Sequence, residues 1–453
     1  MTKVVEKIET DLLNVLSSCR TLLLSGDLLE AEKNLGVFME KLYTDLMSTV
    51  LNEVGQSSDF RTRLLSAYSD LGIKDVRLRS TRIQLKNGEW VCYKSYYARK
   101  VGKQFRHSTR HLSQVYWSCQ KGSSLAYASL LSAFSVVSIS YEIGHQLLSL
   151  TGIKSNKSRF RELSNCLADS SLSKGDEILL SDSESLADKR VVISFDGGRS
   201  RTRQANGKRN KAGNACYETP WREPKVMVVQ VLDEQGKLVR KKHLPLYLAT
   251  MQSTEKAMKR LAKLLKSLQI DQAQQIQFIA DGARSIWKHI MKVLRSLKLN
   301  FSKVTFTLDY YHALEHLGDL VGLLKDILPE QEQLAKVLEQ YKEWLWKGKI
   351  DEIITDFKKQ VRAAKKKLSK EMKTALKYFR KHRHRMNYSL FKKRKLLCGS
   401  GLVESAVRRI VNLRFKGSSS FWKEDNLEKM LFLRCVFLAG RWGNLLKANN
   451  LHH

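Results

Sequence analysis

The sequence contains little proline and no recurring cysteine spacing. Only four prolines occur in 453 residues, and there is no low-complexity tract, which argues against long disordered linkers. None of the seven cysteines forms a C-x-x-C pair, so neither a zinc knuckle nor a disulfide framework is predicted. Scattered thiols fit a reducing compartment, and we expect a cytoplasmic protein.

Long apolar runs are scarce as well. The stretch "GSSLAYASLLSAFSVVSISY", residues 122–141, is uncharged and approaches the length that crosses a membrane. It is rich in serine and alanine and continues into a polar helical pattern. We therefore expect a buried helix here and no membrane partner.

Acidic residues are few relative to basic ones. Lysine and arginine total 80 against 45 aspartate and glutamate, which gives a formal charge of +35. Such an excess indicates a polyanionic partner, with nucleic acid as the first candidate and an acidic membrane surface as the second. The length and the 43% hydrophobic content are enough for two to four domains with their own cores.

The N-terminal third is predicted to be mostly helical. Residues 1–105 show helical periodicity and one β-hairpin at about 76–98, marked by the pair Asn87-Gly88. Residues 106–175 are predicted as helices, including a helix, a short Thr-Gly turn and a second helix opened by Ser155 or Asn156. This spacing is typical of a helix-turn-helix and equally of an ordinary helical hairpin with a basic rim. In the first case, DNA contacts are expected at Lys154, Lys157 and Arg159. An acidic, serine-rich stretch that follows is predicted to be a linker.

The middle of the chain has the order of an RNase H-like core. In residues 188–317, three strands are followed by helix, strand, helix, strand and helix. Residues 318–397 are predicted as a basic all-α insertion, with seventeen lysines or arginines against a single acid between Phe357 and Lys395. Residues 398–453 would complete the core. The predicted fold class is therefore α/β, with a mixed sheet and a helical insertion.

Three carboxylates occupy particular places in this order. Asp196 ends the first strand, Asp281 ends the fourth, and Glu404 lies in the first turns of a late helix. The first and fourth strands are adjacent in such a sheet, so their acids should meet, and the helix can add the third. Carboxylate oxygens are the ligands that Mg²⁺ prefers, and two such ions suit phosphodiester chemistry. The alternatives are ordinary: Asp-Gly turns for the first two acids and a pair with Arg408 for Glu404.

Four segments lie in order within about residues 190–440: "FDGGR", "IADGARSIW", "LDYYHALEHL" and "GSGLVESAVRRIVNLRFKGSSSFW". Together they resemble the DDE transposases of bacterial insertion sequences, most closely the ISKra-type family, which is related to Mutator-like elements. The resemblance implies a metal-binding triad of Asp196, Asp281 and Glu404, with Mg²⁺ or Mn²⁺ as two ions. It implies accessory roles for Asp309 and His312, and whether Asp281 or Asp309 is the second main ligand stays open.

The resemblance also implies an activity and a set of partners. The activity would be metal-dependent cleavage of element ends and strand transfer on double-stranded DNA, by a homodimer or larger assembly associated with the nucleoid. The alternatives are a catalytically silent DNA-binding protein derived from a transposase, and a structure-specific nuclease on the same fold. Further DNA contacts are expected at basic residues after the first acid and around the glutamate helix: Arg199, Arg201, Arg203, Lys208, Arg209, Lys211, Arg408, Arg409 and Arg414.

Overall fold

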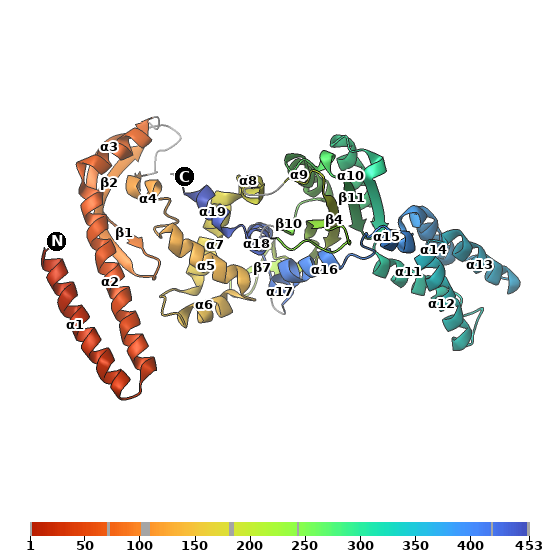
Figure 1. Cartoon of the computed structure of the whole chain (residues 1–453), viewed down its shortest axis with the longest axis horizontal. Helices are drawn as coiled ribbons and strands as arrows, with labels where there is room; N and C mark the ends of the chain where they lie inside the picture. Colours follow the sequence, from red (N-terminus) through yellow and green to blue (C-terminus); the bar gives the residue numbers. More distant parts are fainter. Residues whose placement is uncertain are drawn as a thin grey trace. The chain divides into compact units, whose positions relative to one another are not determined.

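A computed structural model of the chain describes residues 2–69, 73–100, 109–180, 185–241, 244–417 and 420–450. Two compact units make up the chain: residues 1–171 with 446–453, and residues 172–445. Figure 1 shows their helices and strands. The two units are described separately, and the division into five segments stays a prediction.

The first unit begins with a long helical hairpin. Asp27 ends the turn between its helices and caps the second one, because its side chain accepts a hydrogen bond from the Glu30 N–H at 3.0 Å. The helices of this unit are α1 (Thr2–Leu24), α2 (Leu28–Gln56), α3 (Ser58–Ala67), α4 (Leu112–Tyr116), α5 (Leu125–Val137), α6 (Tyr141–Ser149) and α7 (Lys157–Leu172).

The predicted β-hairpin is confirmed in this unit. Strands β1 (Ile73–Gln84) and β2 (Trp90–Lys100) pair antiparallel, and the short β3 (Thr109–His111) pairs with β2. Gly88 takes a left-handed conformation in the connecting turn, with φ of +85°, a backbone geometry that favours glycine.

The uncharged stretch forms the predicted buried helix. Tyr127 and Leu131 of α5 are fully buried and pack with Phe160 of α7. Asn156 opens α7 by accepting the Arg159 N–H at 2.9 Å, as predicted for the second helix of the pair. Among the described residues, no helix is both long and apolar enough to span a membrane.

The second unit is built on a five-stranded mixed sheet with the order β10-β9-β4-β11-β12. Strands β11 and β12 run parallel to β4, whereas β9 is antiparallel to both β4 and β10. The five predicted strands are all present: β4 (Arg190–Gly197), β9 (Lys225–Leu232), β10 (Leu246–Thr250), β11 (Gln275–Ala280) and β12 (Val304–Leu308).

Helices surround this sheet, and several follow it in sequence. Most of the longer helices are amphipathic and bury their apolar side chains, as the predicted periodicity requires, whereas the helix at Glu424–Leu438 is buried on most sides. They are α8 (Gly175–Leu180), α9 (Thr254–Ser267), α10 (Arg284–Ser296), α11 (Tyr310–Gly322), α12 (Gln331–Lys347), α13 (Ile350–Ala363), α14 (Lys370–His382), α15 (Tyr388–Lys393), α16 (Gly401–Val407), α17 (Leu413–Phe415), α18 (Glu424–Leu438) and α19 (Trp442–Asn449), the last of which crosses into the first unit.

The linker prediction is wrong for the part of that stretch that the structure describes. Helix α8 lies within it, and Ile178 and Leu179 are buried. Asp176 pairs with Arg260 at 2.9 Å and with Lys263 at 3.2 Å. The acids of this stretch therefore include partners of basic residues on α9, and its apolar residues belong to the core.

A small β-ribbon that the sequence did not predict follows β4. It consists of two short antiparallel pairs, β5 (Ser200–Arg201) with β8 (Trp221–Arg222) and β6 (Gln204–Arg209) with β7 (Ala215–Glu218). Most residues of β6 and β7 are exposed or half-buried, so the ribbon has no core of its own. We refer to residues 199–222 as the basic ribbon.

Candidate active site

The sheet register places three acids side by side at one edge. Strand β11 pairs in register with both β4 and β12, and the last paired residue of each strand is followed by an acid. These acids are Asp196, Asp281 and Asp309. Neighbouring strands lie about 4.8 Å apart, so the three backbones meet at the carboxyl edge of the parallel strands.

Helix α16 brings Glu404 to the same unit and packs against β4 and β9. Its start is tied to the sheet through Asp309, whose Oδ1 accepts the Ser400 N–H at 2.8 Å. The Ser400 hydroxyl in turn donates to Glu404 Oε1 at 2.6 Å. A chain of two hydrogen bonds therefore connects the end of β12 to the glutamate side chain.

Glycines next to the acids permit close approach to neighbouring elements. A Cβ atom on Gly198 would lie 2.8 Å from the Val411 side chain, on the π-helical turn η6 (Arg408–Asn412) that follows α16. A Cβ on Gly282 would lie 2.4 Å from the Tyr378 ring. Strand β4 continues through Gly197, so Asp196 lies within a paired strand and not in the alternative Asp-Gly turn.

The electrostatics of Asp196 connect the candidate residues. Burial raises the pKa of the Asp196 carboxyl to about 6, and Asp281 and Glu404 add smaller upward contributions. The Gly197 N–H, which donates to Asp196 at 2.7 Å, and His312 both lower this pKa. The two acids and His312 thus lie within electrostatic range of Asp196.

Asp309 differs from the other acids because both of its oxygens are engaged. Oδ1 accepts the Ser400 N–H, and Oδ2 accepts the His312 N–H at 3.2 Å as the cap of α11. The residue is fully buried. The His312 side chain is 41% exposed, and its Nδ1 lies 3.2 Å from the Glu315 carboxylate. Asp309 therefore holds neighbouring elements together in the interior, whereas the His312 side chain lies at the protein surface.

The carboxylate oxygens of the three predicted ligands suit a hard divalent cation, although the three side chains do not lie close enough together to coordinate one ion. One oxygen each of Asp196, Asp281 and Glu404 accepts a hydrogen bond, from Gly197 N–H, Ala283 N–H and Ser400 O–H respectively. The second oxygen of each carboxylate is left for a cation, and Mg²⁺ and Mn²⁺ prefer such ligands. In the described part of the chain, however, no three His, Cys, Asp or Glu side chains come close enough together to hold a metal ion.

The basic ribbon leads directly away from Asp196. It contains seven lysines or arginines and one acid, and the six of them predicted to contact DNA are all exposed. Two arginines stack on aromatic rings of the opposite strands, Arg201 over Trp221 and Arg203 over Tyr217, at 4.9 and 3.5 Å from the ring centroids. The ribbon is fixed to the unit where the Arg203 N–H donates to the Trp422 carbonyl at 2.7 Å.

The basic residues around the glutamate helix divide into exposed and engaged ones. Arg408 is exposed. Arg409 donates to the Tyr247 hydroxyl at 2.6 Å, and Arg414 is 3% exposed and stacks over Trp422. The Arg414 guanidinium is thus not available to a DNA phosphate in this conformation, and the DNA contact at Arg408 stays a prediction.

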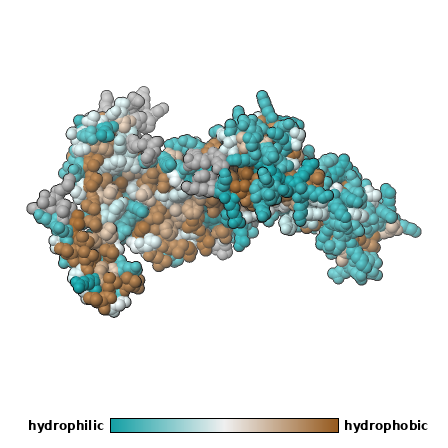
Figure 2. Space-filling model, viewed as in Figure 1, coloured by the Kyte–Doolittle hydropathy of each residue, from teal (hydrophilic) through white to brown (hydrophobic). Residues whose placement is uncertain are grey.

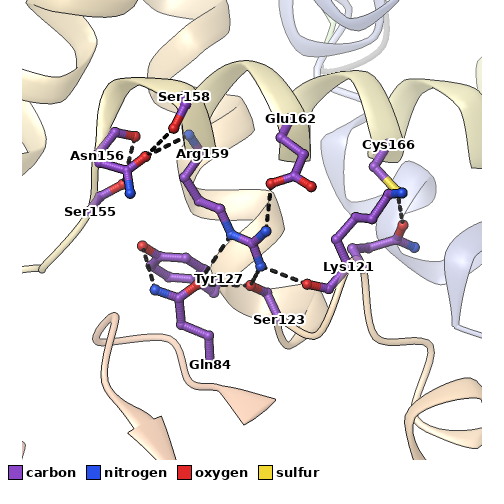
Figure 3. Close-up of polar contacts among 11 residues, drawn as sticks. Gln84, Lys121, Ser123, Tyr127, Ser155, Asn156, Ser158, Arg159, Glu162 and Cys166 are labelled. Carbon is purple, nitrogen blue, oxygen red and sulfur yellow. Dashed lines mark hydrogen bonds and ion pairs between the residues drawn. The ribbon is translucent and has the colours of Figure 1, made fainter. Parts of the chain in front are cut away.

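In the first unit, the predicted DNA contacts at the start of α7 are engaged within the protein. Lys154 pairs with Glu89 at 2.7 Å, and Lys157 pairs with Glu142. Arg159 has only 14% of its side chain exposed. Figure 3 shows its guanidinium among the side chains of Gln84, Ser123 and Glu162 and the Lys121 carbonyl, with which it forms hydrogen bonds of 2.6–3.3 Å. Recognition of DNA by these residues stays a prediction, and Arg159 would first have to give up those contacts.

One residue near the acids escaped the sequence analysis. Tyr378 of α14 packs on the Gly282 backbone, and its hydroxyl is buried with no hydrogen-bond partner among the described residues. Burial and the nearby charges of Asp281 and Asp309 raise its pKa, so the hydroxyl stays protonated. No local motif marks this tyrosine, because only the packing of α14 against the end of β11 brings it to the site.

Comparison with protein-family models gives no match, and no curated protein matches the chain. Among solved structures, a Drosophila P element transposase strand transfer complex matches with a TM-score of 0.25 and 12% sequence identity. The match covers 73% of this chain and 82% of that chain. A TM-score of this size does not establish a shared fold, so the site is interpreted from its own geometry.

Proposed function

We propose that the second unit is an RNase H-like nucleotidyl-transfer domain and that the chain is a DDE-type transposase acting on double-stranded DNA. The observation that carries the proposal is the register of β4 and β11, which sets Asp196 and Asp281 side by side. The effect of Glu404 on the Asp196 pKa supports the third position of the triad.

Asp196, Asp281 and Glu404 are the residues that would hold Mg²⁺ or Mn²⁺, each through its second carboxylate oxygen. When bound, two such ions activate a water or a 3′-hydroxyl and stabilise the leaving oxygen of a phosphodiester. Both Asp309 oxygens accept backbone N–H groups and its side chain is fully buried, which favours Asp281 as the second main ligand.

The remaining residues would position the triad and the DNA. Asp309 holds Ser400, and Ser400 orients the Glu404 carboxylate through its 2.6 Å hydrogen bond. His312, which is exposed and within electrostatic range of Asp196, would donate a hydrogen bond to a phosphate oxygen. The lysines and arginines of the basic ribbon would neutralise phosphates on both sides of the cleaved bond. Such phosphate contacts position DNA without reading its sequence.

A second candidate function is that of a DNA-binding protein without catalysis. It is favoured by the finding that, among the described residues, no three potential ligands form a metal-binding set. The two proposals differ in one respect: whether DNA brings the carboxylates together around a cation.

Cleavage of a labelled duplex separates the two. The duplex carries the DNA that flanks this chain's own coding sequence, and Mg²⁺ or Mn²⁺ is added to wild type, Asp196→Asn, Asp281→Asn and Glu404→Gln. We expect each triad variant to lose cleavage and joining while retaining DNA affinity, and Asp309→Asn to lose only part. Asp271→Asn, an exposed acid before β11, is the control and should remain active. Binding by wild type without cleavage under either metal would leave the non-catalytic function.

A further inference from the structure

We propose that the α1–α2 hairpin is the surface through which two copies of this chain associate. The inference rests on the first unit alone and does not depend on the proposed catalytic function. The two helices pack on each other through one face only, where Ala31 and Phe38 are buried and Lys41 pairs with Asp11 at 3.0 Å.

A second face of the hairpin is apolar and exposed. On α2, seven large apolar side chains recur at steps of three, four or seven residues, which places them on one side of a helix. Three more do so on α1. The ten residues, each 36–59% exposed, are Leu12, Leu16, Leu23, Leu28, Leu35, Met39, Tyr43, Leu46, Val50 and Val54.

The two rows lie on the same side of the hairpin. Leu16 follows Val15, which faces α2, and Met39 follows Phe38, which faces α1. The exposed rows are therefore displaced in the same sense from the packed faces of two antiparallel helices, which brings them to one side. Figure 2 shows hydrophobic surface running along these helices. We call these ten residues the apolar face.

The net negative charge of the hairpin disfavours an anionic partner for the apolar face. Residues 1–56 contain nine acids and five bases, a net charge of −4 in a chain whose total is +35. Lys33 and Lys41 are both engaged with acids, Glu30 and Asp11. Nucleic acid and acidic membranes, which suit the rest of the chain, are therefore poor partners for the hairpin.

Length points to a second copy of the same hairpin. Helix α2 has 29 residues and α1 has 23, about 43 and 35 Å at 1.5 Å per residue. Among the other described helices, the longest has 17 residues, or about 26 Å. Two helices with one exposed apolar face form half of a four-helix bundle, and another α1–α2 hairpin matches both its length and its apolar rows.

The area is sufficient for a stable dimer. If each half-exposed side chain presents on the order of 80 Å², the ten residues offer roughly 800 Å² per copy. A standard protein interface buries about 800 Å² per partner. The apolar face is therefore about as large as one side of a standard protein interface.

Sedimentation of the nuclease-treated full chain in 0.5 M salt tests the proposal. We expect twice the 52.1 kDa of one chain, and a mass that does not fall with added salt because the contact is apolar. The variant Met39→Lys/Leu46→Lys should weaken dimerisation at least tenfold, because two charges would be buried in the interface. Far-ultraviolet circular dichroism establishes that the variant remains folded, and Met39→Ala/Leu46→Ala provides a milder change.

Val37→Lys is the matched control, because Val37 is 70% exposed on the same helix. It lies two residues from Met39, about 160° round the helix from it, and its substitution should leave the dimer intact. A monomeric wild type at tens of micromolar would overturn the proposal. It would also be overturned by a dimer that survives Met39→Lys/Leu46→Lys, or by one that Val37→Lys dissociates equally. A complex of wild type with a different protein, in place of a dimer, would assign the apolar face to that partner.

Discussion

At the scale of single residues, the candidate site contains one acid whose carboxylate is fixed by hydrogen bonds and another whose negative charge is unfavourable where it lies. Asp309 is buried with both oxygens satisfied, so it fixes the junction of β12, α11 and the Ser400 turn. Asp196 is half-buried, and this burial, with smaller contributions from Asp281 and Glu404, makes its ionised form unfavourable. Such a cost in the native state is typical of positions kept for function.

The pH dependence of stability should reveal this cost at Asp196. Its folded-state pKa of about 6 lies above the ordinary 3.8. The native state therefore binds more protons than the unfolded state between these values, and Asp196 makes stability fall as pH rises from about 4 to 6. We expect Asp196→Asn to raise the Tm at pH 8 by at least about 2 °C and to leave it unchanged near pH 4.

Thermal unfolding by calorimetry without divalent metal measures this difference. The comparison uses both proteins in the same buffers at pH 4, 6 and 8. Asp271→Asn, at an exposed position, should show no pH-dependent gain. An Asp196→Asn variant that is less stable than wild type at pH 8 would contradict the electrostatic interpretation of the site.

Tyr378 carries a second residue-scale prediction. Its buried hydroxyl has no partner among the described residues, so Tyr378→Phe should leave the Tm unchanged or raise it. If DNA binding uncovers this hydroxyl so that it donates to a phosphate beside Asp281, the same change lowers cleavage about ten- to hundredfold.

Tyr388→Phe is the matched comparison for Tyr378→Phe. The Tyr388 hydroxyl donates to the Leu308 carbonyl at 3.1 Å, so its removal should cost about 1 kcal/mol of stability. Melting curves and single-turnover cleavage rates for both variants separate the two roles. A Tyr378→Phe protein that melts lower yet cleaves normally would make Tyr378 an ordinary core residue.

At the scale of elements, the sequence predicted the core strands because each is an apolar run bounded by polar or glycine residues. The register that joins Asp196 to Asp281 follows from that order, so the positions of two acids were predictable. The basic ribbon was not, because its short strands bear charges on exposed faces and show no apolar alternation. Helix α8 was missed because its acids resembled a solvated linker, whereas Arg260 and Lys263, far along the chain, neutralise one of them.

The basic ribbon makes a prediction about DNA binding. Lys208 and Lys211 are exposed near its tip, and removing one lysine–phosphate interaction should reduce the slope of log K against log salt by about 0.9. We therefore expect Lys208→Ala/Lys211→Ala to lower that slope by about 2. Fluorescence anisotropy with a labelled 30-bp duplex at several salt concentrations measures it.

A control at the opposite end of the parallel strands, away from the three acids, makes the ribbon experiment specific. Lys266 and Lys298 are exposed near the ends of α9 and α10, which lead back to the amino ends of β11 and β12. Lys266→Ala/Lys298→Ala removes the same charge and should leave the slope unchanged. Equal effects of both double variants would show that net charge, and not the ribbon, governs binding.

At the scale of the whole molecule, charge separates two kinds of surface. Residues 1–56 have a net charge of −4, so the remaining residues have +39, since −4 and +39 give the total of +35. Phosphate contacts weaken with salt because counterions are no longer released into dilute solution. Apolar contacts do not weaken in this way. Added salt should therefore weaken DNA binding and leave self-association intact.

Sedimentation with a labelled duplex between 0.05 and 0.5 M salt should show this separation. We expect two chains on one duplex at low salt, and free duplex with an intact protein dimer at high salt. Met39→Lys/Leu46→Lys should still bind the duplex at low salt, because the apolar face has no lysine and takes no part in phosphate contacts. If that variant lost DNA binding as completely as self-association, DNA binding by the basic part of the chain would depend on the acidic hairpin. If the wild-type dimer dissociated along with the DNA at high salt, the duplex and not the apolar face would hold the two chains together.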